Sequence, residues 1–224
     1  MGIFFSKKKS YWVPEHRKMQ DTIEEPSKWK PVQDMTGWQL QNSLGNKLGD
    51  AIVSSRQTAE INLSYNGLGD DECEYLAKAI KETRTIKRLI LENNHIHTAG
   101  AKMLADALTP AKGQDDPFLE ELNLCNNSIG SEGATAVAGV LTSNKTLKKV
   151  NLFWNNIGNQ GLQEICANLR KDLPQDFLLD VRYNGFDRGD NSVDWTQMTK
   201  QLSDSKLIYN DGEAGQQFLG WPAD

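Results

Sequence analysis

Cysteine is scarce in this 224-residue sequence, and its three copies, Cys73, Cys125 and Cys166, include no C-x-x-C pair. This scarcity disfavours a disulfide framework and a paired-cysteine metal site, and it indicates free thiols in a reducing compartment. No apolar run approaches the roughly 18 residues that a membrane-spanning helix needs. The net charge of −5 disfavours a nucleic-acid groove along the body of the protein.

Catalytic motifs are also missing. The sequence has no G-x-x-x-x-G-K-S/T phosphate loop, no H-E-x-x-H zinc motif, no G-x-S-x-G nucleophile turn and no kinase motif set. His95 and His97 stand alone and are expected in a surface turn, and Asp115 and Asp116 in a solvated loop. We therefore predict a protein that is not an enzyme and has no catalytic residue, metal, cofactor or small-molecule substrate.

What the sequence does contain is a repeated unit, and its clearest copy is Leu119–Gly133, LEELNLCNNSIGSEG. Leu122 and Leu124 alternate with polar residues, which predicts a short strand with one apolar face. The amide of Asn127 can hold the chain as it turns out of the strand. Apolar residues after Gly133 follow helical spacing. A strand–turn–helix unit of this kind needs copies beside it to bury its apolar side.

The asparagine of this unit recurs at intervals of 28, 33, 28 and 29 residues. Each of these asparagines follows two alternating apolar residues and is followed, two positions later, by one more apolar residue. The asparagines are Asn66, Asn94, Asn127, Asn155 and Asn184. The pattern resembles the leucine-rich repeat, and the period with a full helix resembles its ribonuclease-inhibitor-like class. The resemblance implies an α/β solenoid of about five repeats, with a short curved parallel sheet inside and helices outside.

The ends of the repeat region are expected to be irregular. Counting back 28 residues from Asn66 gives Trp38, so residues 35–55 are interpreted as a degenerate N-terminal cap repeat. The longer interval carries its excess in Pro110–Pro117, a polar segment predicted to be a surface insertion. Residues 191–203 are predicted to form a closing helix. The predicted domains are 1–33, an extended N-terminal segment; 34–203, the repeat domain; and 204–224, a C-terminal tail.

The N-terminus begins MGIFFSKKK and resembles that of N-myristoylated proteins. Gly2 and Ser6 fit the M-G-x-x-x-S/T pattern. One myristoyl chain gives only weak membrane binding, so a second signal is needed. Lys7, Lys8 and Lys9 can supply it by attraction to an anionic membrane surface. The expected location is the cytoplasmic face of a membrane; a disordered basic tail without lipid is the alternative.

Residues 10–33 show neither helical nor alternating spacing and are interpreted as a linker. Trp12 and Trp29 lie in it, and tryptophans in a linker are typical of a docking segment. Two docking sites stay open at this point: a partner protein, or the solenoid of the same chain.

Repeat register predicts the residues on the concave side of the sheet. The two positions before the repeated asparagine put Phe153, Trp154, Arg182 and Tyr183 together, while Tyr65 is the one aromatic residue there in the first three repeats. Aromatic residues and arginine are typical of binding hot spots. We predict partner-binding residues here, the alternative being that the C-terminal tail or the linker tryptophans cover them.

These observations favour a non-enzymatic protein–protein interaction scaffold tethered to a membrane. Two alternatives stay open. One is a regulator of a small GTPase, because the activator of the nuclear-transport GTPase Ran uses the same class of repeat, an analogy at the level of fold. The other is a structural subunit of a ciliary or cytoskeletal assembly.

Overall fold

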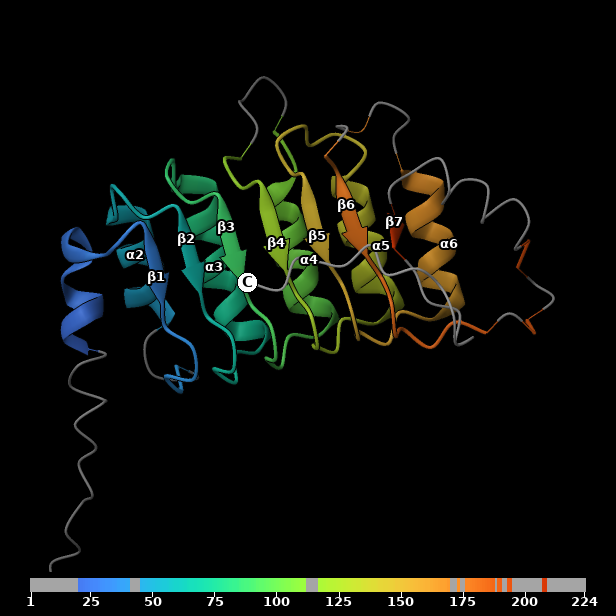
Figure 1. Cartoon of the computed structure of the whole chain (residues 1–224), viewed down its shortest axis with the longest axis horizontal. Helices are drawn as coiled ribbons and strands as arrows, with labels where there is room; N and C mark the ends of the chain where they lie inside the picture. Colours follow the sequence, from blue (N-terminus) through green and yellow to red (C-terminus); the bar gives the residue numbers. More distant parts are fainter. Residues whose placement is uncertain are drawn as a thin grey trace, which may run out of the picture.

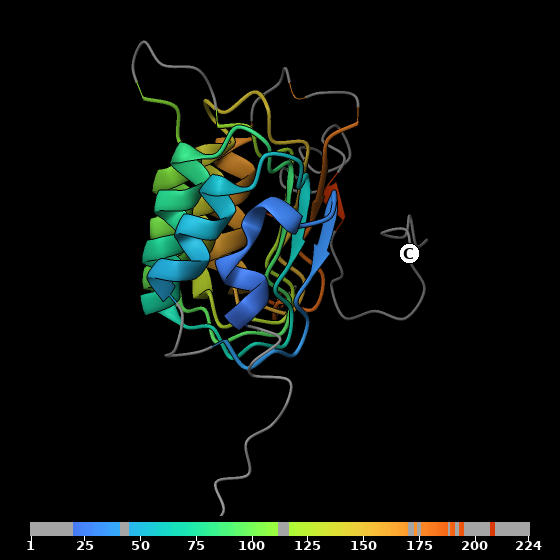
Figure 2. The ribbon, with the colours of Figure 1, turned by 90° about the vertical axis from the view of Figure 1, so that its left-hand side faces the viewer.

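The chain folds into two layers, a parallel sheet and a row of helices that all lie on one face of it (Figures 1 and 2). The computed structural model describes residues 20–40, 45–111, 117–169, 173, 176–187, 189–190, 193–194 and 207–208. The strands are β1 Val32–Asp34, β2 Glu60–Asn62, β3 Arg88–Ile90, β4 Glu121–Asn123, β5 Lys149–Asn151, β6 Leu178–Asp180 and β7 Leu207–Ile208. The helices are η1 Pro26–Lys28, α2 Gly45–Ser54, α3 Asp70–Glu82, α4 Thr98–Leu108, α5 Gly130–Val140 and α6 Gly158–Asn168.

The strands pair in sequence order, each parallel to the next and in the same register. Their central residues are apolar and stack beside one another under the helices; they are Ile61, Leu89, Leu122, Val150 and Leu179. All five are at most 2% exposed. One residue of each strand from β2 to β6 therefore enters a continuous core while its neighbours face the opposite side. This confirms the predicted α/β leucine-rich-repeat solenoid, including a strand and helix ahead of the first regular repeat.

Helices pack closely because small residues stand at their contacts. A side chain at Gly133, in the first turn of α5, would meet the Cβ of Ala101 in α4 at 3.1 Å. The same Cβ would lie 2.3 Å from Cγ2 of Ile129, so glycine lets the helix start pack against both neighbours without a shift. The repeated glycines therefore serve helix packing as well as the turn into the helix.

At the N-terminal end the structure differs from the sequence expectation. Residues 20–24 are helical, and strand β1 begins at Val32, so the packed domain begins before the boundary drawn at residue 33. Trp29 is 1% exposed, and its indole N–H donates a hydrogen bond to the Thr22 carbonyl at 2.8 Å. Ile23 is buried with it. These side chains close the end of the core, so Trp29 docks on its own solenoid, whereas Trp12 lies outside the described residues.

The C-terminal end also carries more sheet than expected. Leu207 and Ile208, assigned from sequence to a separate tail, form β7 and pair in parallel with Leu179 and Asp180 of β6. Leu207 follows Leu179 by 28 residues, the same period as in the body of the repeat array. The predicted closing helix at 191–203 lies almost entirely outside the described residues. Residues 112–116 of the insertion also lie outside them.

Candidate protein-binding face

The repeated asparagines link each repeat to the one before it. Asn155 is fully buried, and its side-chain N–H₂ donates to the Leu124 carbonyl at 2.8 Å and to the Phe153 carbonyl at 3.1 Å. The backbone N–H of Asn155 in turn donates to the side-chain oxygen of Asn184 at 2.6 Å. Asn94, Asn127 and Asn184 make the equivalent contacts to the carbonyls of the preceding repeats. This ladder satisfies buried polar groups where the chain leaves the sheet, and it fixes the position of the residue ahead of each asparagine.

The residue ahead of each asparagine, or at the matching position of the cap, has a left-handed backbone. We call these six the rim column: Gly37, Tyr65, Asn93, Asn126, Trp154 and Tyr183, with φ between +50° and +69°. Glycine and asparagine adopt this conformation at little cost, whereas bulky side chains rarely do. Three of the six positions are nevertheless aromatic. Tyr65, Trp154 and Tyr183 are also the most exposed aromatic side chains in the described part of the chain, at 59%, 61% and 53%.

Phe153, Trp154 and Tyr183 form an aromatic cluster at the ends of β5 and β6. The ring centre of Phe153 lies 4.9 Å from that of Tyr183 and 6.4 Å from that of Trp154. Phe153 is half-buried and its two neighbours are exposed. The structure thus brings together the aromatic residues that the sequence placed side by side, while Tyr65 stands apart on the β2 repeat.

Arg182 belongs to the same region, but its guanidinium is already engaged. Its Nη2 lies 2.5 Å from Oδ2 of Asp180, and its Nε donates to Oδ1 at 2.9 Å. The hydrogen bonds to Asp180 raise the pKa of the arginine further. The guanidinium carbon also lies 5.4 Å from the ring centre of Phe153, within the range of a cation–π contact. Arg182 thus supports the cluster from within the protein, which the sequence pattern did not indicate.

A second polar feature runs along the strands and was not anticipated. The side-chain oxygen at the last strand position accepts the backbone N–H two residues on, as Asn151 does from Phe153 at 2.9 Å. Asp34, Asn62, Asn123 and Asp180 make the same local turn. The sequence signal was Asn or Asp at this position of every strand from β1 to β6 except β3, which has Ile90, because Asn and Asp favour local side chain–backbone bonds.

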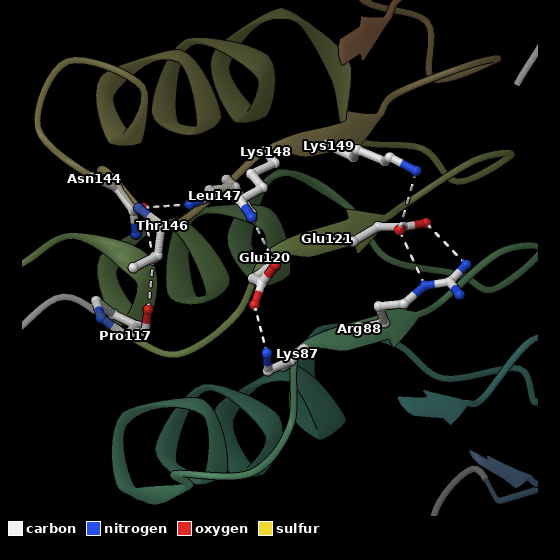
Figure 3. A network of polar contacts seen from close by, with 10 residues as sticks. All are labelled: Lys87, Arg88, Pro117, Glu120, Glu121, Asn144, Thr146, Leu147, Lys148 and Lys149. Carbon is white, nitrogen blue, oxygen red and sulfur yellow. Dashed lines mark hydrogen bonds and ion pairs between the residues drawn. The ribbon is translucent and has the colours of Figure 1, made fainter. Parts of the chain in front are cut away.

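Charges at the start of the strands alternate in sign across the sheet (Figure 3). Arg88 lies 2.9 Å from Glu60 and 3.0 Å from Glu121, and Lys149 approaches Glu121 at 3.9 Å. One residue earlier, Glu120 contacts Lys87 at 2.9 Å and Lys148 at 3.0 Å. Hydrogen bonds from these two lysines lower the pKa of Glu120. Opposite charges on neighbouring strands favour the observed order of repeats.

Three further titratable residues were considered from the sequence or lie near the aromatic cluster: Cys125, His95 and His97. Burial, with the charges of Glu92 and Asp180, raises the pKa of the Cys125 thiol to about 12, so it is not activated as a nucleophile. His95 and His97 line a hollow at the loop edge, where Asp70 accepts the backbone N–H of His97 at 2.8 Å. Across the described ranges, no group of three or more His, Cys, Asp or Glu side chains could hold a metal ion. In the same ranges, no helix is long and apolar enough to cross a bilayer.

Comparison with known sequences identifies the repeat. The family described as Leucine Rich repeat matches residues 83–105, 116–138 and 143–166. Pig (Sus scrofa) ribonuclease inhibitor is 32% identical over 110 residues, which cover 49% of this chain and 23% of that protein. The mouse (Mus musculus) protein NACHT, LRR and PYD domains-containing protein 12 is 31% identical over 140 residues, covering 61% of this chain and 13% of that protein. The chain thus spans less than a quarter of these relatives.

Two solved structures are similar to the chain at low sequence identity. The structure described as Leiomodin-1 Actin-Binding Site 2 has a TM-score of 0.46 and 14% identity, covering 83% of this chain and 86% of that one. The tropomodulin C-terminal domain of Caenorhabditis elegans has a TM-score of 0.48 and 12% identity, covering 69% and 90%. Together with the sheet and helix order above, the repeat matches show that this chain is built of leucine-rich repeats and folds as an α/β solenoid.

Proposed function

We propose that the chain is a non-enzymatic scaffold protein that binds a protein partner through the aromatic cluster. Leucine-rich repeats are typical of protein-interaction domains, which supports this class of function. The observation that carries the proposal is the left-handed backbone of Trp154 and Tyr183. Asparagine or glycine would suit this conformation better, and Asn93 and Asn126 occupy it in neighbouring repeats. Strained backbone of this kind is typical of functional sites.

Exposure supports the same conclusion. Trp154 and Tyr183 leave more than half of their surface in contact with solvent, so the core gains little from them. Large aromatic side chains that lie together on a surface are typical of interfaces, where tryptophan and tyrosine carry much of the binding energy. A partner that covers the cluster would gain this energy, which offsets the cost of the strained backbone.

The second part of the proposal concerns location. Gly2, followed by Ser6 and three lysines, supports a myristoylated tether to the cytoplasmic face of a membrane. Gly2, Lys7, Lys8 and Lys9 lie outside the described residues, so this part rests on the sequence motif. A tether would hold the scaffold, and any partner on the aromatic cluster, at the membrane surface.

The binding proposal is tested with the double variant Trp154→Asn/Tyr183→Asn. Because asparagine suits a left-handed backbone, the melting temperature should stay the same or rise, while partner affinity should fall by about a hundredfold or more, since hot-spot aromatic residues each contribute roughly 2 kcal/mol or more. The measurement is quantitative affinity isolation from cells with mass spectrometry, beside thermal unfolding of the purified variants.

Phe118→Asn is the matched control, because it removes an exposed ring ahead of β4, away from the cluster. It should leave partner recovery unchanged. Full partner recovery by the double variant would refute the proposal. A large drop in its melting temperature would also refute it, since that result would mean that the rings pack against the chain itself.

A further inference from the structure

Glu92 differs from the other charged residues of the concave face. Arg88, Lys149 and the two glutamates at the start of the strands pair with one another, and Asp180 pairs with Arg182. Glu92 is half-buried and accepts only amide hydrogen bonds, from Asn93 at 2.9 Å and from Asn123 at 3.4 Å. No cation contacts it within the described part of the chain. Asp34, the other carboxylate of this face without a cation, is exposed to water at the edge of the sheet.

A half-buried carboxylate without a counter-ion keeps a negative field over the face. Burial is the first cause of the high pKa of the neighbouring Cys125, and the charge of Glu92 is the next. A cation brought by a partner would remove this imbalance, because burying a charge is costly unless it is paired. The same field repels phosphate groups, which disfavours nucleic acid and anionic lipid on this face.

Tyr65 and Glu92 lie side by side along the backbone of neighbouring repeats. Its backbone N–H donates to the Glu92 carbonyl at 3.0 Å, and its ring is 59% exposed. An aromatic ring next to a carboxylate suits a lysine or arginine side chain, because the ring face attracts the cation and the carboxylate pairs with it. This explains why an aromatic residue occupies the rim column at Tyr65, far from the aromatic cluster.

The distance between Glu92 and the aromatic cluster indicates the length of the segment that could contact both. Glu92 follows β3 and Trp154 follows β5, so two strand spacings separate their repeats, about 10 Å. An extended chain covers that distance in about three residues. Between the sites lie the side-chain amides of Asn93 and Asn126, which are hydrogen-bonded to each other. These amides add polar surface along the path of such a chain.

We propose that the concave face binds an extended segment of a partner protein, which places a lysine or arginine on Glu92 and Tyr65 and, about three residues away, a large apolar side chain on the aromatic cluster. This inference rests on the proposed binding function and adds the chemistry of the partner. An acidic or purely apolar segment would leave one of the two sites unfilled.

The test selects phage-displayed random twelve-residue peptides on the full chain. Peptides from the unmodified protein should be enriched in a basic residue about three positions from a large apolar one. Selection on Glu92→Gln should lose the basic residue and keep the apolar one. Synthetic copies of the selected peptides should bind Glu92→Gln about tenfold more weakly, an effect typical of a lost interface ion pair, and should bind the unmodified chain more weakly at high salt.

Glu132→Gln is the matched control, because it removes the same charge from helix α5, where Glu132 pairs with Lys102 on the helical side. It should leave selection and affinity unchanged. This inference is overturned if basic residues are enriched equally in peptides selected on Glu92→Gln, or if they are not enriched in peptides selected on the unmodified protein. In either case, peptides whose binding needs Trp154 would still support the proposed function. If peptides bind the Trp154→Asn/Tyr183→Asn variant as well as the unmodified chain, or if none bind at all, both are overturned.

Discussion

Arg182 and Asp180 form a buried ion pair beneath the aromatic cluster. Nη2 of the arginine lies 2.5 Å from Oδ2 of the carboxylate, and the two side chains are 13% and 1% exposed. Removing one partner of a buried pair leaves the other charge uncompensated. The pair therefore supports the face that holds Phe153, and its loss is expected to affect folding before binding.

Arg182→Ala should lower the free energy of unfolding by about 3–5 kcal/mol, the range for a broken buried pair. Chemical denaturation followed by circular dichroism measures it. The double variant Asp180→Asn/Arg182→Gln, which removes both charges, should recover a large part of the loss. If Arg182→Ala keeps full stability but loses partner binding, Arg182 is a direct contact and not a support.

Asn155 is predicted to be essential to the stack because it joins two repeats. Asn155→Ala leaves the Ile129 N–H without its side-chain acceptor, while the Leu124 carbonyl loses one of its two side-chain donors and keeps Asn127. A buried polar group left unpaired costs about 1–3 kcal/mol, so a loss of about that size is expected in denaturant unfolding. Asn168→Ala is the control, since its amide bonds only to an exposed carbonyl in its own helix. Equal effects of the two changes would show that the ladder contributes little.

A substitution in the core should destabilise the protein far more than a deletion within the insertion. Leu124 is fully buried, and Leu124→Ala should cost about 2–5 kcal/mol. Deleting residues 112–116 restores a 28-residue interval between Asn94 and Asn127 and should cost less than about 1 kcal/mol. Pro117 is retained because its carbonyl accepts the hydroxyl of Thr146 at 2.6 Å. Thermal unfolding compares the two, and a similar loss in both would mean that the deleted residues pack against the body.

Membrane attachment is predicted to depend on Gly2. Intact mass of the protein from eukaryotic cells should show a myristoyl group, and Gly2→Ala should move the protein to the soluble fraction, because the modification needs an N-terminal glycine. Neutralising Lys7, Lys8 and Lys9 should weaken binding to anionic vesicles and remove its dependence on salt. An unmodified or acetylated N-terminus in wild-type protein would contradict this prediction.

The sequence by itself determined the repeat and everything that follows from its period. Parallel strands stack in register, so residues at equivalent positions of successive repeats lie side by side; this placed Leu122, Val150 and Leu179 in one core and Phe153 near Tyr183. The same reasoning found a cap repeat ahead of Asn66. Periodicity is local information, and it is sufficient wherever a residue has the same role in every repeat.

Tertiary structure decided what departs from the period. The burial of Trp29 and the pairing of β7 depend on the two ends of the stack, where no further repeat supplies a partner. The ion pair of Arg182 with Asp180, and the lack of a cation at Glu92 among the described residues, depend on which side chains meet on the face. The left-handed backbone of Trp154 and Tyr183 depends on the hydrogen bonds of the asparagine ladder. These contacts join residues whose types vary from repeat to repeat, so the period alone could not supply them.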